Sequence, residues 1–505
     1  LIGLAGAGAS SGMAMAHWEI QGWMILILGW VFVPFYTRSM VYTMPEFLER
    51  RYNPQSRTIL SVISLVSYVL TKVAVTVYAG GLVFQQVFGI KELWGIDFFW
   101  IAAIGLVVLT ALYTIFGGMK SVLYTSVLQT PILLLGSLII LVLGFKELGG
   151  WDEMMRVCGA VTVNDYGDTM TNLIRSNDDA NFPWLGALIG SAIIGFWYWC
   201  TDQFIVQRVL SGKNEMEARR GTIFGAYLKL LPVFLFLIPG MIAFALHQKY
   251  IGAGGEGFLP MLANGTANAD AAFPTLVAKL LPAGVKGLVV CGILAALMSS
   301  LASLFNSSAM LFTIDFYKRF RPETPEKKLV GIGQVATVVI VILGILWIPI
   351  MRSVGDVLYT YLQDVQSVLA PGIAAAFLLG ICWKRTSAQG GMWGLIAGMV
   401  IGLTRLGAKV YYSNAGEVAD STFKYLFYDM NWLFFCGWMF LFCIIVVIVV
   451  SLATKAPTAE KIQGLVFGTA TKEQKAATRA SWNHWDIIHT VIILAITGAF
   501  YWYFW

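Results

Sequence analysis

The sequence predicts an all-α protein that crosses a membrane many times, and three observations support this prediction. Of its 505 residues, 58% are hydrophobic and only 12% are charged. Soluble domains carry about 25% charged residues, so this composition excludes a soluble globular protein. Apolar runs of about 18 or more residues, long enough to cross a bilayer, recur along the chain. No segment shows the alternation of a half-buried strand.

The apolar runs predict twelve membrane spans. They follow a first segment of the chain that is rich in glycine and alanine. They cover residues 18–36, 58–86, 98–117, 122–145, 184–208, 221–246, 287–317, 329–351, 355–383, 389–407, 431–454 and 485–505. Pro232, Pro239 and Pro371 lie inside spans and are expected to kink them, because proline removes a helical hydrogen bond.

The basic residues predict the orientation. Lys and Arg are about twice as frequent in the alternate loops that begin with 37–57 as in the other set, so the first set is assigned to the cytoplasm. The net charge of +6 then belongs to cytoplasmic loops and indicates no nucleic-acid partner. A multi-pass protein of a plasma membrane is expected. The outward loops lack paired cysteines, which favours a bacterial over an animal exterior and hence a bacterial inner membrane.

Hydroxyl side chains cluster in the middle of one span. Ser299, Ser300 and Ser303 lie near the centre of the apolar run 287–312. Buried hydroxyls must find hydrogen-bond partners. They can bond the backbone of their own helix, or they can line an ion site, and the pattern alone leaves both open.

Three further polar residues lie at membrane depth. Glu19 opens the first complete span, and Lys229 and Gln363 lie inside later ones. An ionisable group at mid-bilayer costs a few kcal/mol unless it is paired or wet. Their convergence on a wet cavity is the simplest interpretation. Snorkelling or a structural interhelical bond are the alternatives for each of them.

Segment 193–210 combines aromatic and polar residues within one span. Four aromatics precede Thr201, Asp202 and Gln203, which indicates a broken or cavity-facing helix. An aromatic belt at the membrane interface is the alternative. Aromatic faces beside amide, carboxylate and ammonium groups suit a polyhydroxylated solute, which offers both C–H faces and hydroxyls.

Other functional classes lack their signatures. The glycine-rich run 6–12 has no lysine and no preceding strand, so no ATP-binding loop is visible. A channel predicts charge rings and repeated pore segments, and a membrane enzyme predicts motifs such as HExxH; neither pattern occurs. An enzyme is therefore not expected.

Several motifs together resemble the solute:sodium symporters, most closely the sodium/glucose cotransporter branch. The resemblance runs from residue 1 to about 455, and its most specific pieces are YTMPEFLERRY (42–52), FWYWCTDQFIVQRVLSGKN (196–214), LMSSLASLFNSSAMLFTIDFY (297–317) and YTYLQDVQSVLAPGIAAAFLLGICWKR (359–385).

The resemblance implies the LeuT-type fold, which has two inverted five-helix repeats with discontinuous first helices. About 14 transmembrane helices are then expected in the full chain, with the first helix and part of the next lying before residue 1. Residues 1–455 would form the transporter core. Residues 456–505 would form a cytoplasmic linker and a peripheral terminal helix.

The function implied is Na⁺-coupled symport of a monosaccharide of the glucose/galactose type by alternating access. Myo-inositol or another small polar solute is the alternative substrate, and a sugar sensor that does not transport is the alternative function. Na⁺ would be the co-transported ion and membrane lipid the surroundings. The sequence assigns no oligomeric state.

The resemblance also implies roles for individual residues. The Ala296 carbonyl and the Ser299 and Ser300 hydroxyls would bind Na⁺, together with carbonyls from before residue 1. Glu19, Lys229 and Gln363 would bind solute hydroxyls. Tyr198, with Trp199 beside it, would close the inner side of the site. The outer gate would consist of Leu4, Trp18 and Tyr359.

Two departures from the family pattern affect specificity and stoichiometry. Gly195 stands where relatives place an Asn or Thr that touches sugar, so one solute contact is expected to be lost or replaced by water. Members that carry two sodium ions have an aspartate at the position of Ser126 and a Thr or Ser at that of Ala302. One Na⁺ per sugar is therefore predicted.

Overall fold

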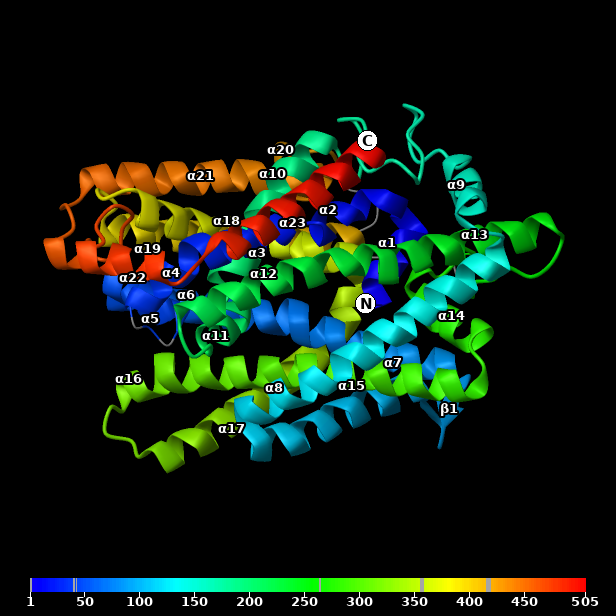
Figure 1. Ribbon diagram of the computed structural model, residues 1–505, viewed down its shortest axis with the longest axis horizontal. Helices are drawn as coiled ribbons and strands as arrows, with labels where there is room; N and C mark the ends of the chain where they lie inside the picture. The colour runs from blue at the N-terminus through cyan, green and yellow to red at the C-terminus, as the bar shows by residue number, and fades with distance from the viewer. Residues whose placement is uncertain (1, 40, 42, 263–264, 355–357, 415–418) are drawn as a thin grey trace.

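The computed structural model describes residues 2–39, 41, 43–262, 265–354, 358–414 and 419–505, apart from the side chains of residues 113, 115–126, 128 and 351–354. It is a bundle of helices that run mainly along one axis (Figure 1). In the described part of the chain, the only paired strands are β1 (Glu92–Leu93) and β2 (Ile96–Asp97), a short antiparallel hairpin. Its turn residues Trp94 and Gly95 both have positive φ, 54° and 74°, as a two-residue type I′ turn requires.

The first part of the chain supplies the elements α1 (Ile2–Ser11), η1 (Gly12–Met15), α2 (Ala16–Glu19), α3 (Gly22–Ile27), η2 (Leu28–Phe32), α4 (Val33–Ser39), α5 (Met44–Arg51), α6 (Pro54–Ser67), η3 (Tyr68–Val73), α7 (Ala74–Phe88), α8 (Phe98–Leu148) and α9 (Trp151–Gly159). The middle part supplies α10 (Trp184–Gly195), η4 (Phe196–Thr201), α11 (Gln203–Leu210), α12 (Glu215–Pro232), η5 (Val233–Leu237), α13 (Ile238–Gly252), η6 (Ala269–Ala271), α14 (Ala272–Leu280), α15 (Ala283–Met310), η7 (Leu311–Tyr317) and α16 (Lys318–Phe320).

The last part supplies α17 (Glu326–Val354), α18 (Leu358–Cys382), α19 (Ala388–Asn414), α20 (Thr422–Lys424), η8 (Tyr425–Asp429), α21 (Trp432–Ala453), η9 (Ala459–Lys461), α22 (Lys472–Ala480) and α23 (His484–Tyr503). The segments η1, η6 and η9 are 3₁₀ helices, and the other η segments are π-helical.

Eleven helical stretches among the described residues are long and apolar enough to cross a bilayer, and 98–112 forms a shorter apolar helix. Together they coincide with the twelve predicted spans. The first stretch starts earlier than predicted, at Ile2, but α1 turns sharply into the next helices at Gly12. This residue has a φ of 63°, and a Cβ there would lie 2.0 Å from the Met170 carbonyl oxygen. Only glycine fits this close turn.

Two predicted spans, 98–117 and 122–145, lie within the single 51-residue element α8, so the helix boundary expected between them is absent. A straight helix of this length would extend about 76 Å, more than twice the hydrocarbon core. Both parts of α8 nevertheless contact the same region. A Cβ at Gly80 would lie 2.4 Å from Leu106, in the first part of α8, and 3.6 Å from Leu297 of α15. A Cβ at Gly292 of α15 would lie 3.3 Å from Ile132, in the second part of α8. The element therefore makes two crossings along α15, which Figure 1 shows as a blue and a cyan leg.

Proline affects the helices unequally. Pro232 ends α12, and the π-helical η5 follows it directly, as a kink predicts. Pro239 lies at the start of α13, where its missing N–H costs little. Helix α18 continues through Pro371.

The last helix, α23, packs against α3 and α12 (Figure 1). The Trp30 indole donates to the Thr490 hydroxyl over 2.9 Å, and Arg220 pairs with Asp486 at 3.2 Å. The opposite face of α23 is largely exposed. This exposure is typical of a helix at the lipid-facing edge of a bundle.

Candidate functional site

Three side chains from three helices meet at a buried carboxylate. Glu19 ends α2, directly before the chain bends into α3. Its Oε2 lies 2.6 Å from the Nζ of Lys229 on α12, and its Oε1 accepts a 2.5 Å hydrogen bond from the Tyr359 hydroxyl on α18. The side chains of Glu19 and Lys229 are only 7% and 14% exposed. Glu19 and Lys229 are therefore joined by an interhelical ion pair, which was the alternative to a wet cavity for each of them.

Aromatic rings and an open acceptor border this pair. Lys229 Nζ lies 5.5 Å from the centre of the Trp199 ring, and Tyr198 packs edge-on against Trp199 at 5.1 Å. Gln363 lies one turn beyond Tyr359 on α18, and its buried Oε1 has no hydrogen-bond partner in the part of the chain that is described. The cluster offers cationic donors, amide and carboxylate acceptors and aromatic faces, which are the groups that bind hydroxylated rings.

A broken helix positions the aromatic residues. The helix α10 passes into the π-helical η4, and the backbone at Asp202 is extended with φ −79° and ψ 128° before α11 begins. Asp202 caps the new helix by accepting from the Phe204 N–H at 3.2 Å. The break predicted within 193–210 is thus confirmed. Tyr198 and Trp199 are the two middle residues of η4.

A second buried charge pair lies beside this break. Lys72, on the π-helical η3, bonds the Asp202 carboxylate, which also accepts a 2.7 Å hydrogen bond from the Tyr68 hydroxyl. Lys72 Nζ lies 4.9 Å from the centre of the Tyr198 ring. Neither residue of this pair was predicted to have a functional role. Lys72 is the only charged residue of span 58–86, and Asp202 is the only acidic residue of span 184–208, which indicated that each charge needed a partner.

The three outer-gate residues divide into two groups. Tyr359 packs on α1, because a Cβ at Gly3 would lie 3.2 Å from the Tyr359 Cβ, and the neighbouring Leu4 is buried at 3% exposure. Trp18 instead stacks on Trp432 of α21, with ring centres 5.3 Å apart. Tyr359 was expected as a hydrophobic gate, yet its hydroxyl bonds Glu19, so it belongs to the polar cluster as well.

The predicted sodium ligands lie together on α15. Ala296 and Ser299 are half-buried, and Ser300 is exposed. Ser303 bonds its own helix, since its hydroxyl donates to the Ser299 carbonyl at 2.9 Å. Among the described residues, no group of three or more His, Cys, Asp or Glu side chains could hold a metal ion. The oxygens at this place on α15 are neutral, and neutral oxygens suit a weakly held alkali cation.

The two departures noted in the sequence have different outcomes. At Gly195, a Cβ would lie 2.5 Å from the Gln21 Oε1, and the Gln21 amide donates to the Ser191 carbonyl at 2.8 Å. Gln21 therefore fills the space beside Gly195. The Ser126 side chain lies outside the described residues, whereas Ala302 is fully buried.

Comparison with known proteins identifies the family. The model of the sodium:solute symporter family matches residues 1–398. The chain belongs to the sodium:solute symporter family. The human sodium/myo-inositol cotransporter 2 is 36% identical over 481 residues, 93% of this chain and 70% of that protein. The zebrafish (Danio rerio) sodium/glucose cotransporter 4 is 36% identical over 91% of this chain and 71% of its own, and the sheep (Ovis aries) sodium/glucose cotransporter 1 is 38% identical over 90% and 70%.

A solved structure agrees with the fold. A Na⁺-coupled sialic acid symporter, in a substrate-bound outward-open state, superposes with a TM-score of 0.66 at 19% identity and covers 90% of this chain and 86% of its own. The symporter therefore has the LeuT-type inverted-repeat fold, as predicted. It is a multi-pass membrane protein that couples the transport of a small solute to Na⁺, and it is not an enzyme.

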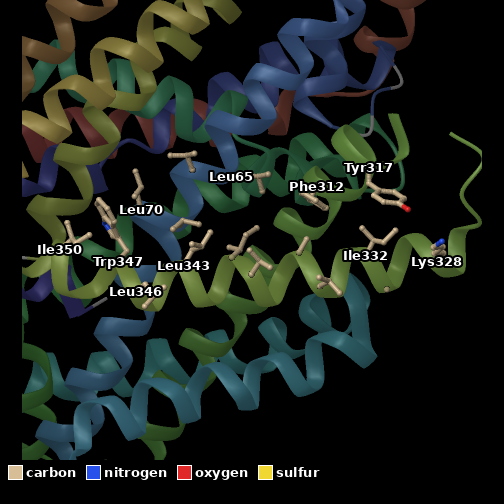
Figure 2. Close-up of a pocket in the computed structure, with 17 residues that line it drawn as sticks. Leu65, Leu70, Phe312, Tyr317, Lys328, Ile332, Leu343, Leu346, Trp347 and Ile350 are labelled. Carbon is tan, nitrogen blue, oxygen red and sulfur yellow. The ribbon is translucent and has the colours of Figure 1, made fainter. Parts of the chain in front are cut away.

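Two hollows in the symporter differ in chemistry. One of about 970 Å³ is lined by polar groups such as Gln207, Asn306 and Thr313, and by Lys213 and Lys318, which lie between predicted spans on the side assigned to the cytoplasm. It therefore opens toward the predicted cytoplasmic side. The other, of about 980 Å³, lies between α6–η3 and α17 and is lined by apolar side chains from Leu65 to Ile350, with Lys328 at one end (Figure 2). A polyol there would leave its hydroxyls unpaired, so this groove is unsuited to the solute.

Proposed function

We propose that the symporter carries a monosaccharide of the glucose/galactose type together with one Na⁺. The observation that supports this most is the buried cluster of Glu19, Lys229 and Tyr359, bordered by Trp199 and by the open acceptor of Gln363. A pyranose presents hydroxyls that match these donors and acceptors and a C–H face that matches the indole.

Sodium would bind at the Ala296 carbonyl and at the Ser299 and Ser300 hydroxyls. It couples to the solute if it favours the conformation that binds solute, since a ligand shifts an equilibrium only by its differential affinity. Solute would follow, the outer gate formed by Leu4, Trp18 and Tyr359 would close, and Tyr198 would move aside toward the cytoplasmic cavity.

Myo-inositol is the second candidate solute. It is favoured by the human relative, which is named a sodium/myo-inositol cotransporter, whereas the zebrafish and sheep relatives are named sodium/glucose cotransporters. Both solutes are six-membered rings that carry hydroxyls, so the cluster around Glu19 can bind either. Gly195, where the family resemblance implies an Asn or Thr that touches sugar, is one position that can select between them, and Gln21 fills the space beside it.

Uptake by proteoliposomes tests the proposal. Labelled glucose, galactose and myo-inositol are supplied with an inward Na⁺ gradient or with choline in place of Na⁺. Saturable accumulation of a hexose only with Na⁺ is expected. Accumulation of inositol alone would replace the substrate, and binding without accumulation would identify a sensor.

The cellular location is part of the same proposal. The outward loops without paired cysteines support a bacterial inner membrane. Fractionation of the native cells checks this: recovery in a membrane other than the plasma membrane would contradict it.

A further inference from the structure

The Glu19 carboxylate has both of its oxygens engaged by the protein itself. Lys229 Nζ lies 2.6 Å from Oε2, and the Tyr359 hydroxyl donates to Oε1 over 2.5 Å. Glu19 is 5% exposed, so water cannot freely replace either partner. Hydrogen bonds to a charged acceptor are roughly twice as strong as neutral ones. A solute hydroxyl that reaches Glu19 must therefore compete with one of these two groups.

The two partners are not equally replaceable. Lys229 neutralises a charge inside the membrane, and moving it away would leave that charge unpaired. The Tyr359 hydroxyl is a neutral O–H donor, the same kind of donor that a sugar or polyol carries. Exchanging one O–H for another at Oε1 preserves the charge-assisted bond, so Tyr359 is the partner that a solute displaces.

A displaced Tyr359 hydroxyl has an acceptor close by. Gln363 follows Tyr359 by four residues, on the same face of α18, and its buried Oε1 lacks a partner among the described residues. An amide oxygen has two lone pairs, so it can serve the tyrosine and the solute together. The exchange therefore leaves no buried donor unpaired.

Tyr359 also lies at the point where outer elements meet. It is the second residue of α18, and the preceding Leu358 N–H donates to both carboxylate oxygens of Asp270, at 3.0 and 3.2 Å. Its backbone packs against Gly3 of α1. The bond between Tyr359 and Glu19 thus links α1 and α18 to α2 on the outer side.

We propose that the Tyr359 hydroxyl is a displaceable latch: it closes the solute-free outer gate onto Glu19 and competes with solute for Oε1. This makes Tyr359 a residue that determines solute affinity, beyond its place in a hydrophobic gate. The competition rests on the proposed function, because it requires a hydroxylated solute at Glu19. The latch itself does not require one.

Tyr359→Phe tests the competition, with Tyr361→Phe as the matched control. The Tyr361 hydroxyl donates to the Leu70 carbonyl at 3.1 Å and accepts from the Trp347 indole at 2.7 Å, away from Glu19. At saturating Na⁺, Tyr359→Phe is expected to lower the half-saturating hexose concentration about tenfold, equivalent to about 1.4 kcal/mol, and the control is expected to leave it unchanged. An unchanged or raised value in Tyr359→Phe overturns the competition.

Sodium flux without solute tests the latch independently. In solute-free proteoliposomes, the uptake of radioactive Na⁺ is expected to rise severalfold in Tyr359→Phe and to stay at the wild-type level in Tyr361→Phe. Equal fluxes in wild type and Tyr359→Phe would overturn the latch. If wild type accumulates no hexose or polyol, the proposed function fails while this comparison still decides the latch. Thermal unfolding of each variant confirms that it is folded.

Discussion

At the scale of single residues, the membrane interior makes each charge depend on a partner. Glu19 and Lys229 lie 210 positions apart in the chain and pair at 2.6 Å. Removing one member of a buried pair costs about 3–5 kcal/mol, because the other charge stays behind unpaired. The same two residues that bind solute in the proposed mechanism therefore also stabilise the contact between α2 and α12.

Stability and transport can be separated at this pair. Lys229→Met is expected to lower the thermal midpoint clearly and to abolish solute uptake. The double variant Glu19→Gln with Lys229→Met is expected to recover most of the stability, since no buried charge remains, but no uptake. Thermal unfolding and uptake in parallel measure both. Equal stability of the single and double variants would contradict the argument.

The proposed sodium ligands allow a matched comparison on one helix. Ser300→Ala is expected to raise the Na⁺ concentration for half-maximal uptake about tenfold, since one oxygen of a small coordination shell is lost. Ser303→Ala is the control, because the Ser303 hydroxyl bonds the Ser299 carbonyl of its own helix. Uptake measured over a range of Na⁺ concentrations checks both variants. The same Na⁺ dependence in Ser300→Ala and wild type would argue against this ligand.

At the scale of elements, helix interruptions create the places where polar groups gather. The π-helical η4 and the extended Asp202 break one span, and the π-helical η3 brings Lys72 to that break. Such interruptions are frequent at functional sites, because they redirect side chains and free backbone groups. Tyr198 lies between the two buried charge pairs, against Trp199 on one side and Lys72 on the other.

The start of α18 depends on a buried carboxyl group outside the membrane spans. Asp270, on η6, accepts from the Leu358 N–H. Burial raises the pKa of Asp270 from 3.8 to about 7. The folded protein therefore binds the proton of Asp270 more tightly than the unfolded chain does, and protonation of Asp270 stabilises the folded state. The stabilisation is complete below about pH 4, declines as the pH rises and is lost above about pH 7.

Asp270→Asn is expected to flatten this dependence, since the amide keeps an acceptor and does not titrate. The measurement is the thermal midpoint of wild type and variant from pH 5 to 8. Wild type should gain stability relative to the variant toward pH 5. Parallel curves over this range would show that Asp270 does not titrate as described.

At the scale of the whole molecule, the ion stoichiometry limits accumulation. One charge crossing about 100 mV contributes roughly 2.3 kcal/mol, and a tenfold Na⁺ gradient adds about 1.4 kcal/mol. One Na⁺ per solute therefore permits accumulation of roughly 500-fold, and two would square that limit.

The reversal potential of solute-coupled current in proteoliposomes measures this ratio. A ratio of one is expected because the family resemblance implies that Ser126 and Ala302 replace ligands of a second sodium ion. Measurement at two different Na⁺ gradients serves as the internal control. A ratio of two would refute the assignment.

Much of this architecture could be predicted, and the reasons are physical. Twenty or so apolar residues have few alternatives to a spanning helix, because every backbone group must be bonded within lipid. The twelve spans and the break near Asp202 followed from this. The two crossings of 98–117 and 122–145 followed as well, but their union in the single helical element α8 did not, because hydropathy does not show whether the backbone between two spans stays helical.

The sequence by itself determined the membrane class, the family and the candidate residues, because apolar length and dense local motifs are properties of neighbouring positions. Only the tertiary structure decided which buried groups are partners. In the folded protein, Lys72 pairs with Asp202, the Tyr359 hydroxyl donates to the Glu19 carboxylate, and Gln21 fills the space beside Gly195. These contacts join residues more than 100 positions apart, and a lone charge or hydroxyl in a span shows that it needs a partner without showing which one.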